Sequence, residues 1–269
     1  KLKLKDDKKN KLISVIMTCY NGQKYLKKAV ESILIQKYKN WELIFVNNSS
    51  TDKSEDIIKS YQDKRIKYFK TKKLLSLGEV RNLAFSKSKG VYITFLDVDD
   101  YWHKEKLNLQ INKFALNKKI DVVYCNFFKK NRNRLTYSKL NFERGYCQEK
   151  IIQSYIDTKP LTSWLTLMIK KHSIKKLSYP FDKKLHITSD FDLIIRLSEF
   201  AFFDYVPKIL CTYRVHTSNE SKNKKKEISE LSYIIKKFKQ KKSINKILSY
   251  KSFSKKVSLK KIFYQIKPT

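Results

Sequence analysis

Hydrophobic residues follow two different spacings over the first 128 residues of the chain. Helical spacing of apolar residues predicts helices over 23–36, 52–61, 78–87 and 104–116. Short runs between those segments, rich in β-branched and aromatic residues, predict strands over 12–18, 41–46, 66–69, 91–96 and 121–128. Strands that alternate with helices of this length form parallel βαβ units. The pattern therefore predicts an α/β fold with a mixed, mostly parallel sheet flanked by helices.

The pattern changes from residue 129 onward. A charged turn is predicted over 129–134, and residues 135–188 show no clear period. A distinct helix is predicted over 189–200, with Ser189 as its cap and Asp192 completing a capping box. The remaining predicted elements are short strands at 203–206 and 209–215 around Pro207, and Lys-rich amphipathic helices at 227–241 and 244–264.

The chain carries a large positive charge, with 60 Lys and Arg against 25 Asp and Glu, for a net charge of +35. Such a field favours anionic partners: nucleic acid, nucleotides or an acidic membrane surface. A basic nucleic-acid-binding protein is one alternative interpretation. It predicts clustered arginines and a known binding motif, and the sequence contains neither. We therefore expect no nucleic-acid partner.

The cysteines and the apolar runs bear on where the protein acts. The four cysteines are widely spaced, which predicts reduced thiols in a cytoplasmic protein: Cys19, Cys125, Cys147 and Cys211. Residues 1–10 are Lys-rich and polar, unlike a signal peptide. No apolar run reaches the roughly 18 residues that a spanning helix needs.

Acidic residues are scarce, yet three of them follow one apolar strand in the segment Asp97-Val98-Asp99-Asp100. Ligands of open α/β sheets bind at the carboxyl ends of strands, where carboxylates can hold a hard divalent cation. In an extended chain Asp97 and Asp99 would point to the same side and Asp100 to the other. The alternative is a solvated acidic turn that caps the following helix.

Polar residues also follow the other predicted strands. Parallel topology would bring them to the same edge as the acidic segment. This mixture suits a nucleotide, which needs amide and carboxylate partners for its base and ribose and a cation for its diphosphate. The chain lacks Gly-x-Gly-x-x-Gly and Gly-Lys-Ser/Thr, which disfavours dinucleotide oxidoreductases and P-loop NTPases. The residues concerned are Thr18, Tyr20, Asn21, Asn47, Asn48, Ser50, Arg81 and Asn82.

Together these segments resemble the family 2 glycosyltransferases, which have the GT-A fold. The resemblance covers roughly residues 12–220, and its motifs occur in order at plausible spacing. The motifs are Ser14–Gly22, Glu42–Asp52, Gly78–Ala84, Gly90–Asp100, Ser189–Leu197 and Tyr213–Asn219. One motif departs from the family, because Asn47-Asn48-Ser49-Ser50 stands where Asp-Asp-Gly-Ser is usual.

The resemblance implies an inverting transfer of a sugar from a nucleotide-diphosphate sugar to a hydroxyl. It implies Asp190 as the base, Asp99 as a ligand of Mn²⁺ or Mg²⁺, and His216 as a further ligand of the metal or contact to the diphosphate. Asp97 would contact the ribose or the metal. Trp102 would either stack on a sugar or join the core. The expected nucleotide is uridine diphosphate, with Thr18 and Tyr20 framing its base, although the Asn47-Asn48 pair leaves the nucleotide open.

The same resemblance suggests segments and partners. We expect a basic tail at 1–11, a nucleotide-sugar-binding half at 12–128, an acceptor-binding half of the same domain at 129–221, and a Lys-rich helical extension at 222–269. The acceptor would be a glycan or a lipid-linked molecule of surface polysaccharide or lipooligosaccharide biosynthesis. The extension is expected either to rest on the inner face of an anionic membrane or to be a solvated appendage.

A nucleotidyltransferase acting on sugar phosphates is the second alternative to a glycosyltransferase. Such an enzyme also uses a metal and a diphosphate on a related sheet. It more often carries a Gly-rich, basic loop after the first strand, where this chain has Tyr20-Asn21-Gly22-Gln23. The sequence therefore favours the glycosyltransferase.

Overall fold

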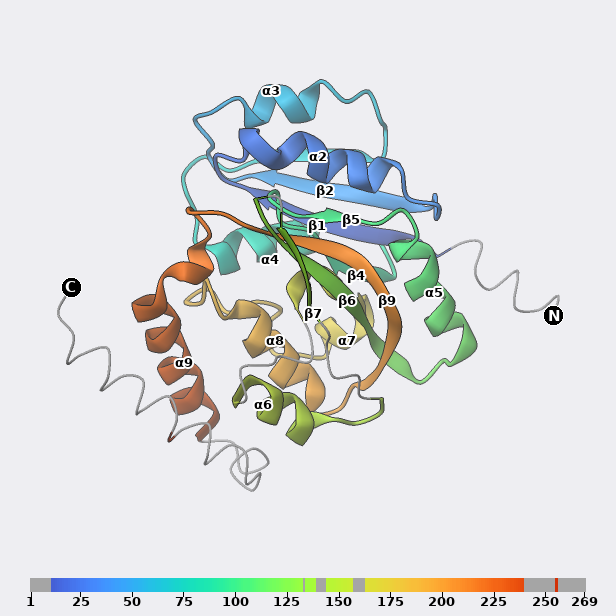
Figure 1. Cartoon of the computed structure of the whole chain (residues 1–269), viewed down its shortest axis with the longest axis vertical. Helices are drawn as coiled ribbons and strands as arrows, with labels where there is room; N and C mark the ends of the chain where they lie inside the picture. The colour runs from blue at the N-terminus through green and yellow to red at the C-terminus, as the bar shows by residue number, and fades with distance from the viewer. Residues whose placement is uncertain (1–10, 133, 139–143, 157–162, 240–254, 256–269) are drawn as a thin grey trace.

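One sheet organises the chain (Figure 1) in the computed structural model, which describes residues 11–132, 134–138, 144–156, 163–239 and 255. Its strand order is β3-β2-β1-β4-β8-β6-β9-β5, and β7 pairs with β6. The strands are β1 (Ile13–Cys19), β2 (Trp41–Asn47), β3 (Ile66–Lys70), β4 (Tyr92–Phe95), β5 (Tyr101–Trp102), β6 (Ile120–Asn131), β7 (Arg134–Ser138), β8 (Met168–Lys170) and β9 (Phe202–Val215). The helices are α2 (Gln23–Leu34), α3 (Ser54–Lys59), α4 (Leu77–Lys87), α5 (Lys106–Leu116), α6 (Gln148–Ile156), α7 (Lys171–Lys175), α8 (Ser189–Ser198) and α9 (Lys224–Lys239), with short 3₁₀ helices η1 (Trp164–Thr166) and η2 (Glu220–Lys222).

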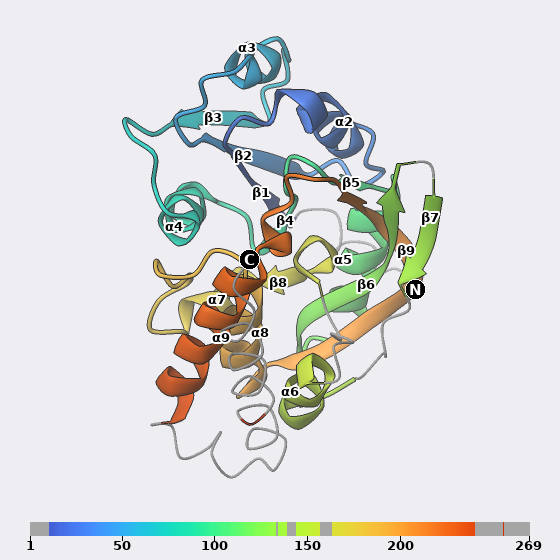
Figure 2. The same cartoon turned by 60° about the vertical axis from the view of Figure 1, so that its left-hand side comes forward.

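The first half of the sheet is parallel, as the alternation of strands and helices predicts. β1 pairs in parallel with β2 and β4, and β2 pairs in parallel with β3. Helices α2 and α3 cover one face of this half, and α4 lies on the other (Figures 1 and 2). The predicted α/β fold class is confirmed. Because these strands are parallel, β1, β2 and β4 all end at one edge of the sheet, which Figure 2 brings forward.

The second half of the sheet is mixed. β8 pairs antiparallel with β4 on one side and with β6 on the other, so it joins the two halves. The long strands β6 and β9 run parallel to each other and curve around the lower half of the molecule (Figure 1). β5 pairs antiparallel with β9. This last pairing brings the end of β9 next to the acidic segment that precedes β5.

Two predictions in this half are wrong. The predicted charged turn at 129–134 is mostly strand: β6 continues to Asn131, and the chain reverses at Arg132, which has a φ of 50°, into β7. Pairing with β9 and β7 on its two sides extends β6. The strands predicted at 203–206 and 209–215 form the single strand β9. Pro207 has no N–H to donate, and the register with β6 skips there from Val206 to Ile209.

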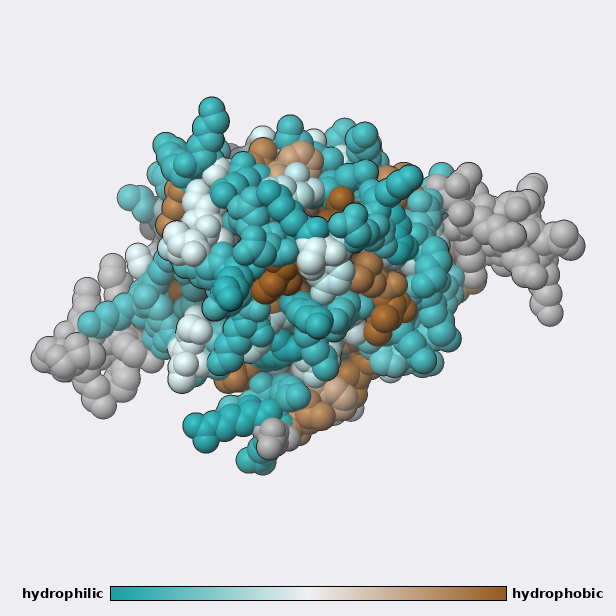
Figure 3. Space-filling view, turned by 90° about the horizontal axis from the view of Figure 1, so that it is seen from above, coloured by the Kyte–Doolittle hydropathy of each residue, from teal (hydrophilic) through white to brown (hydrophobic). Residues whose placement is uncertain are grey.

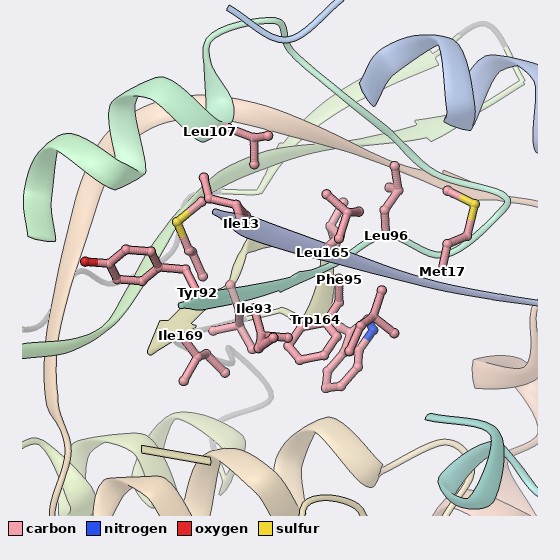
Figure 4. Close-up of a cluster of buried hydrophobic side chains, with 14 of the residues drawn as sticks. Ile13, Met17, Tyr92, Ile93, Phe95, Leu96, Leu107, Trp164, Leu165 and Ile169 are labelled. Carbon is pink, nitrogen blue, oxygen red and sulfur yellow. The ribbon is translucent and has the colours of Figure 1, made fainter. Parts of the chain in front are cut away.

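Aromatic residues from both halves meet in the core. Phe95 of β4 stacks on Trp164 of η1, with ring centroids 3.8 Å apart, and both rings lie beneath β1 in Figure 4. Trp102 is 2% exposed and donates its indole N–H to the carbonyl of Leu165 over 3.1 Å. Trp102 is therefore a core residue, which decides between the two roles expected for it.

Helix α9 is packed against the protein rather than solvated. Its Ile228, Leu231, Ile234 and Phe238 are buried, and all except Ile228 form a second apolar cluster with residues of α8 and the preceding loop: Leu185, Phe191 and Ile195. Figure 2 shows α9 running alongside α8. The apolar face of the predicted extension is thus buried within the molecule as far as Lys239. The rest of the helix predicted at 227–241 and nearly all of that at 244–264 lie outside the described residues.

Polar side chains dominate the face of the molecule that carries α2 and α3. Figure 3, a view onto α2 and α3, shows hydrophilic residues over most of this face, with only small separate hydrophobic areas. Within the described ranges, no helix has both the length and the apolar character needed to cross a membrane.

Helix α4 approaches the second half of the molecule closely at Gly78. A β-carbon at Gly78 would overlap the carbonyl oxygen of Asp182 and lie 2.8 Å from the α-carbon of Lys183. Capping fixes the start of the helix nearby, because Ser76 and Glu79 bond reciprocally to each other's backbone N–H groups. Only glycine therefore permits α4 to dock here.

We predict that Gly78→Ala lowers the free energy of unfolding by about 1–3 kcal/mol, because backbone atoms must move apart. Ser86→Ala on the exposed part of the same helix is the control and should stay within about 0.5 kcal/mol. Denaturant unfolding measures both. Equal stability of the two variants would contradict the close approach.

Candidate active site

The acidic segment after β4 is a turn, not the extended stretch that the sequence predicts. Residues 98 and 99 form the turn, and the N–H of Asp100 donates to the carbonyl of Asp97 over 3.1 Å. Asp100 is 1% exposed and accepts the backbone N–H of Arg214 over 2.8 Å. Burial raises the pKa of Asp100 well above its usual range. Asp100 is therefore an internal link to β9, whereas Asp97 and Asp99 retain exposed surface.

Asp99 meets the residues that follow β9. Its Oδ2 lies 2.9 Å from Nε2 of His216 and accepts a 3.3 Å hydrogen bond from Nδ2 of Asn219. Nδ1 of His216 lies 2.9 Å from the hydroxyl of Ser218. The centroid of its imidazole ring lies 4.9 Å from the centroid of the Tyr25 ring on α2. Both ring nitrogens are thus oriented by polar neighbours, and the ring packs against Tyr25. The structure brings together Asp99 and His216, two of the three residues predicted as metal ligands, the third being Asp97.

Arg81 on α4 is a buried cation between the two halves. It is 6% exposed, and its guanidinium lies 4.2 Å from the ring centre of Trp164. Nη1 donates to the hydroxyl of Ser189, and Nη2 lies 3.6 Å from Oδ1 of Asp97. Its partners lie within the protein, which differs from the free diphosphate-binding cation expected from the sequence.

Asp190 lies in the first turn of α8, next to the serine that Arg81 contacts. Its Oδ1 accepts the N–H of Phe191 over 2.8 Å, and its side chain is half-buried. The predicted capping box at Ser189 and Asp192 is wrong. The cap is Thr188, Ser189 contacts Arg81, and Asp192 pairs with Arg196 over 2.7 Å and with Lys237 of α9.

Electrostatic interactions show that the predicted acidic residues share one site. The charge of Arg81 acts on both Asp97 and Asp190, and the charges of Asp99 and Asp190 both act on Asp97. Burial among these groups raises the pKa of Asp97 to about 6, with Asp99 and Asp190 adding to the rise and Arg81 opposing it. Because 41% of its side chain is still exposed, Asp97 is open to solvent on one side. It loses its negative charge as the pH falls through about 6.

Burial also raises the pKa of Asp190 from its ordinary value, while the N–H of Phe191 and the charge of Arg81 oppose that rise. A raised pKa makes a carboxylate a stronger proton acceptor once it is ionised. Asp190 as the base is still a prediction. Its surroundings give it the chemistry that such a role needs.

The loops after β1 and β2 hold each other. The side-chain oxygen of Asn21 accepts the N–H of Thr51 over 2.8 Å, and the hydroxyl of Ser50 accepts the N–H of Asn21 over 3.0 Å. Asn21 and Ser49 adopt positive φ values of 51° and 59°. The hydrogen bonds between the two loops hold the backbone in this uncommon conformation. Much of the hydrogen-bonding capacity of Asn21 and Ser50 is therefore used to shape the loops.

The asparagines that replace the family's usual aspartates are also partnered. Asn47 donates to the hydroxyl of Tyr68 over 3.2 Å and accepts the N–H of Ser50 over 2.9 Å. Asn48 donates to the carbonyl of Leu75 over 2.9 Å and accepts its N–H over 3.0 Å. Neutral amides can both donate and accept, which a carboxylate cannot do. Asn48 thus braces the end of the loop that leads into α4, and Asn47 ties the loop after β2 to β3.

The other predicted donor-binding residues differ in how open they are. Asn82 is occupied, because its amide donates to the carbonyl of Phe181 over 2.8 Å and accepts its N–H over 3.1 Å. Tyr20 is 53% exposed, and Thr18 is half-buried at the end of β1. Tyr20 is therefore the most exposed of these three at this edge.

The predicted metal has an incomplete set of protein ligands. Among the described residues, no three His, Cys, Asp or Glu side chains are placed to hold an ion together. Asp99 and His216 provide two adjoining donors, and carboxylate oxygen suits Mg²⁺ and Mn²⁺. Such a pair fits a cation whose remaining ligands come from a diphosphate and water, and it does not fit a cation held by protein alone.

A family model described as Glycosyl transferase family 2 matches residues 14–177. The chain belongs to this family. An uncharacterised glycosyltransferase of Methanocaldococcus jannaschii is 36% identical over 211 residues, covering 76% of this chain and 71% of the relative. The Escherichia coli protein UDP-Glc:alpha-D-GlcNAc-diphosphoundecaprenol beta-1,3-glucosyltransferase WfaP is 30% identical over 237 residues, covering 84% of this chain and 86% of the relative.

Solved glycosyltransferase structures share the fold. S. aureus TarS 1-349 in complex with UDP-GlcNAc superposes with a TM-score of 0.68 at 19% identity, over 85% of this chain and 66% of that chain. The mannosyltransferase PcManGT from Pyrobaculum calidifontis, in complex with GDP-Man and Mn²⁺, gives 0.67 at 13% identity, over 96% of this chain and 76% of that chain. At these identities the likeness concerns the fold alone.

Sequence patterns missed several residues of this glycosyltransferase site. Ser189 and Trp164 belong to the site because they contact Arg81, and Tyr25 because it contacts His216. Asn219 lies inside a recognised motif, and its bond to Asp99 spans 120 positions in sequence. The sequence signal for Asn219 was its position as a polar residue three positions after His216.

We predict that Arg81→Met raises the pKa of Asp97 from about 6 to roughly 7 or above, because a nearby cation typically lowers a carboxyl pKa by one or more. Arg81→Lys retains the charge and should leave a smaller change. Lys87→Met, at the exposed end of the same helix, is the control. Carbon-13 NMR titration of labelled aspartates, assigned with Asp97→Asn, measures the pKa. An unchanged pKa in Arg81→Met would contradict the ion pair.

Proposed function

We propose that the protein is an inverting, metal-dependent glycosyltransferase that uses a UDP-sugar and a hydroxyl acceptor on a glycan or lipid-linked molecule. The observation that carries the proposal is that the buried Arg81 pairs with Asp97 and acts on Asp190, while Asp99 and Asp190 both act on Asp97. Two kinds of relative support the choice of substrates. The name of WfaP specifies UDP-Glc and a diphosphoundecaprenol acceptor, and TarS was solved with UDP-GlcNAc.

Asp190 is the base in this proposal. It accepts the proton of the acceptor hydroxyl as that oxygen forms a bond to the anomeric carbon. The bond from that carbon to the diphosphate breaks on the opposite face, and the diphosphate leaves with the electron pair. The raised pKa of Asp190 supports this role, because the carboxylate is a stronger base than one in water.

Asp99 and His216 would hold the divalent cation, and Asp97 would contact the cation or the ribose. A divalent cation supplies charge neutralisation for a departing diphosphate. Arg81 does not contact the donor in this proposal. Its buried charge keeps Asp97 and Asp190 together. Thr18 and Tyr20 would frame the base, with Asn47, Asn48 and Ser50 shaping the wall beside it.

We predict that UDP with Mn²⁺ raises the melting temperature by several degrees, as saturating ligand does, and that UDP alone does so far less. Asp99→Asn should abolish the metal-dependent part of the shift. Asp190→Asn should keep that shift and lower sugar transfer at least a hundredfold. Thermal denaturation and UDP release from UDP-glucose, with a GlcNAc-diphospholipid acceptor, measure these effects.

The control for these variants is Asp56→Asn, an exposed carboxylate on α3, which should behave like the parent protein. Stabilisation by UDP to the same extent with and without metal would contradict the metal role of Asp99. Full transfer activity in Asp190→Asn would contradict the base.

We also propose that the protein contacts an anionic membrane surface, where a lipid-linked acceptor resides, on its cytoplasmic side. The net charge of +35 supports this contact. The buried apolar face of α9 leaves no inserted helix over 224–239, so the contact would be electrostatic. Exposed lysines at the start and along the outer side of α9 are the candidates: Lys222, Lys225 and Lys236.

Replacing these three lysines with glutamine should weaken binding to phosphatidylserine vesicles at low salt by at least tenfold, since each contributes about 1 kcal/mol near such a surface. The matched control replaces Lys24, Lys27 and Lys53, which are exposed on and beside α2 and α3. Vesicle sedimentation measures both. An equal loss in the two variants, or no binding by the parent chain, would contradict an α9 contact.

A further inference from the structure

Glu230 of α9 is a buried carboxylate that bonds to the loop in front of α8. It is 6% exposed. Its Oε1 accepts the N–H of His186 over 3.0 Å. Its Oε2 accepts both the N–H and the hydroxyl of Thr188, each over 2.9 Å. Three donors converge on one side chain, which is what stabilises a buried carboxylate.

The residue that Glu230 holds is the N-terminal cap of the helix that carries Asp190. Thr188 occupies the cap position of α8, and its hydroxyl makes no capping bond to its own helix. It donates to Glu230 instead. Asp190 is two residues farther along, so the position of Thr188 sets where the first turn begins and where Asp190 points. A carboxylate on another helix thus fixes the entry into α8.

Two further contacts hold α9 in place around Glu230. Leu231, Ile234 and Phe238 are buried against apolar residues of α8 and its preceding loop. Lys237 lies seven residues farther along the same helix. It forms ion pairs with Asp182 over 2.8 Å and with the fully buried Asp192 of α8. Both partners belong to the same loop and helix that Glu230 engages. These contacts fix the position of α9, and therefore the position from which Glu230 bonds to the loop before α8.

We propose that Glu230 is a positioning residue for Asp190, and that α9 thereby belongs to the active site although it lies beyond the residues 14–177 matched by the family model. This inference rests on the proposed function, because it takes Asp190 to be the base. Glu230 does not touch the reacting atoms. It holds the loop 186–188 so that the first turn of α8 presents Asp190 beside Arg81.

The charges around Asp190 make the role measurable. Arg81 faces it from α4, and Glu230 faces it from α9; Asp97 is on the β4 side and His186 in the loop before α8. The negative charge of Glu230 raises the pKa of Asp190, and the charge of Arg81 lowers it. Neutralising Glu230 should therefore lower the pKa of Asp190. The base would then ionise at a lower pH and accept a proton less strongly.

The test compares Glu230→Gln and Glu230→Asp with the matched control Glu227→Gln, a carboxylate on the same helix that pairs with Lys224 at the surface. In the ligand-free protein, hydrogen exchange of the amides of residues 186–188 should speed up at least tenfold in Glu230→Gln. Carbon-13 NMR should show a lower pKa for Asp190. Glu230→Asp keeps the charge and should partly restore both values.

Turnover completes the test. With UDP-glucose and a GlcNAc-diphospholipid acceptor, Glu230→Gln should lower kcat roughly 10- to 100-fold, the range expected for loss of positioning. KM for UDP-glucose should stay within about twofold, and the acid limb of the kcat profile should move to lower pH. Glu227→Gln should match the parent protein in every measurement.

Three results would overturn the inference: unchanged exchange and Asp190 pKa in Glu230→Gln, an unchanged kcat, or a loss of UDP binding equal to the loss of kcat. The last would show a merely structural role. Failure of the proposed function looks different. Asp190→Asn would then retain activity, whatever Glu230→Gln does to the exchange rates of the ligand-free protein.

Discussion

A buried guanidinium between two halves of one sheet determines the arrangement of this site. Arg81 loses most of its hydration, and a buried charge is stable only where opposite charge and hydrogen-bond acceptors surround it. Asp97, Ser189 and the ring of Trp164 supply those partners from β4, α8 and η1. The cation therefore offsets the repulsion between Asp97 and Asp190. Separation of the two halves would leave that charge unpaired.

Local patterns were enough to predict the first half of the fold and the residues at its edge. The runs that form β1, β2 and β4 are hydrophobic enough to be recognised without a partner, and parallel pairing then places Thr18, Asn47 and Asp97 at one edge. The capping box at Ser189 failed for a tertiary reason. Arg81, 108 positions earlier in the chain, takes the serine hydroxyl, and Lys237 takes Asp192. No local rule can anticipate partners so distant in sequence.

The polar residues in the loops show the same limit. Asn47, Asn48 and Asn82 occupy the positions that the family resemblance assigns to donor binding, yet each is bonded to its own protein. They organise the wall beside the site. The more accessible groups are Tyr20, Asp97 and the Asp99–His216 pair. In the proposed site a few accessible groups are thus held in place by many partnered ones, and we count α9 among the latter.

The most direct test of this account is a crystal structure with UDP and Mn²⁺, with anomalous scattering recorded at the manganese edge. The account predicts one peak at the pair formed by Asp99 and His216, with the diphosphate on it and Asp190 facing the open side. A manganese ion and nucleotide bound elsewhere on the protein, with Asp99 and His216 still paired only to each other, would contradict it.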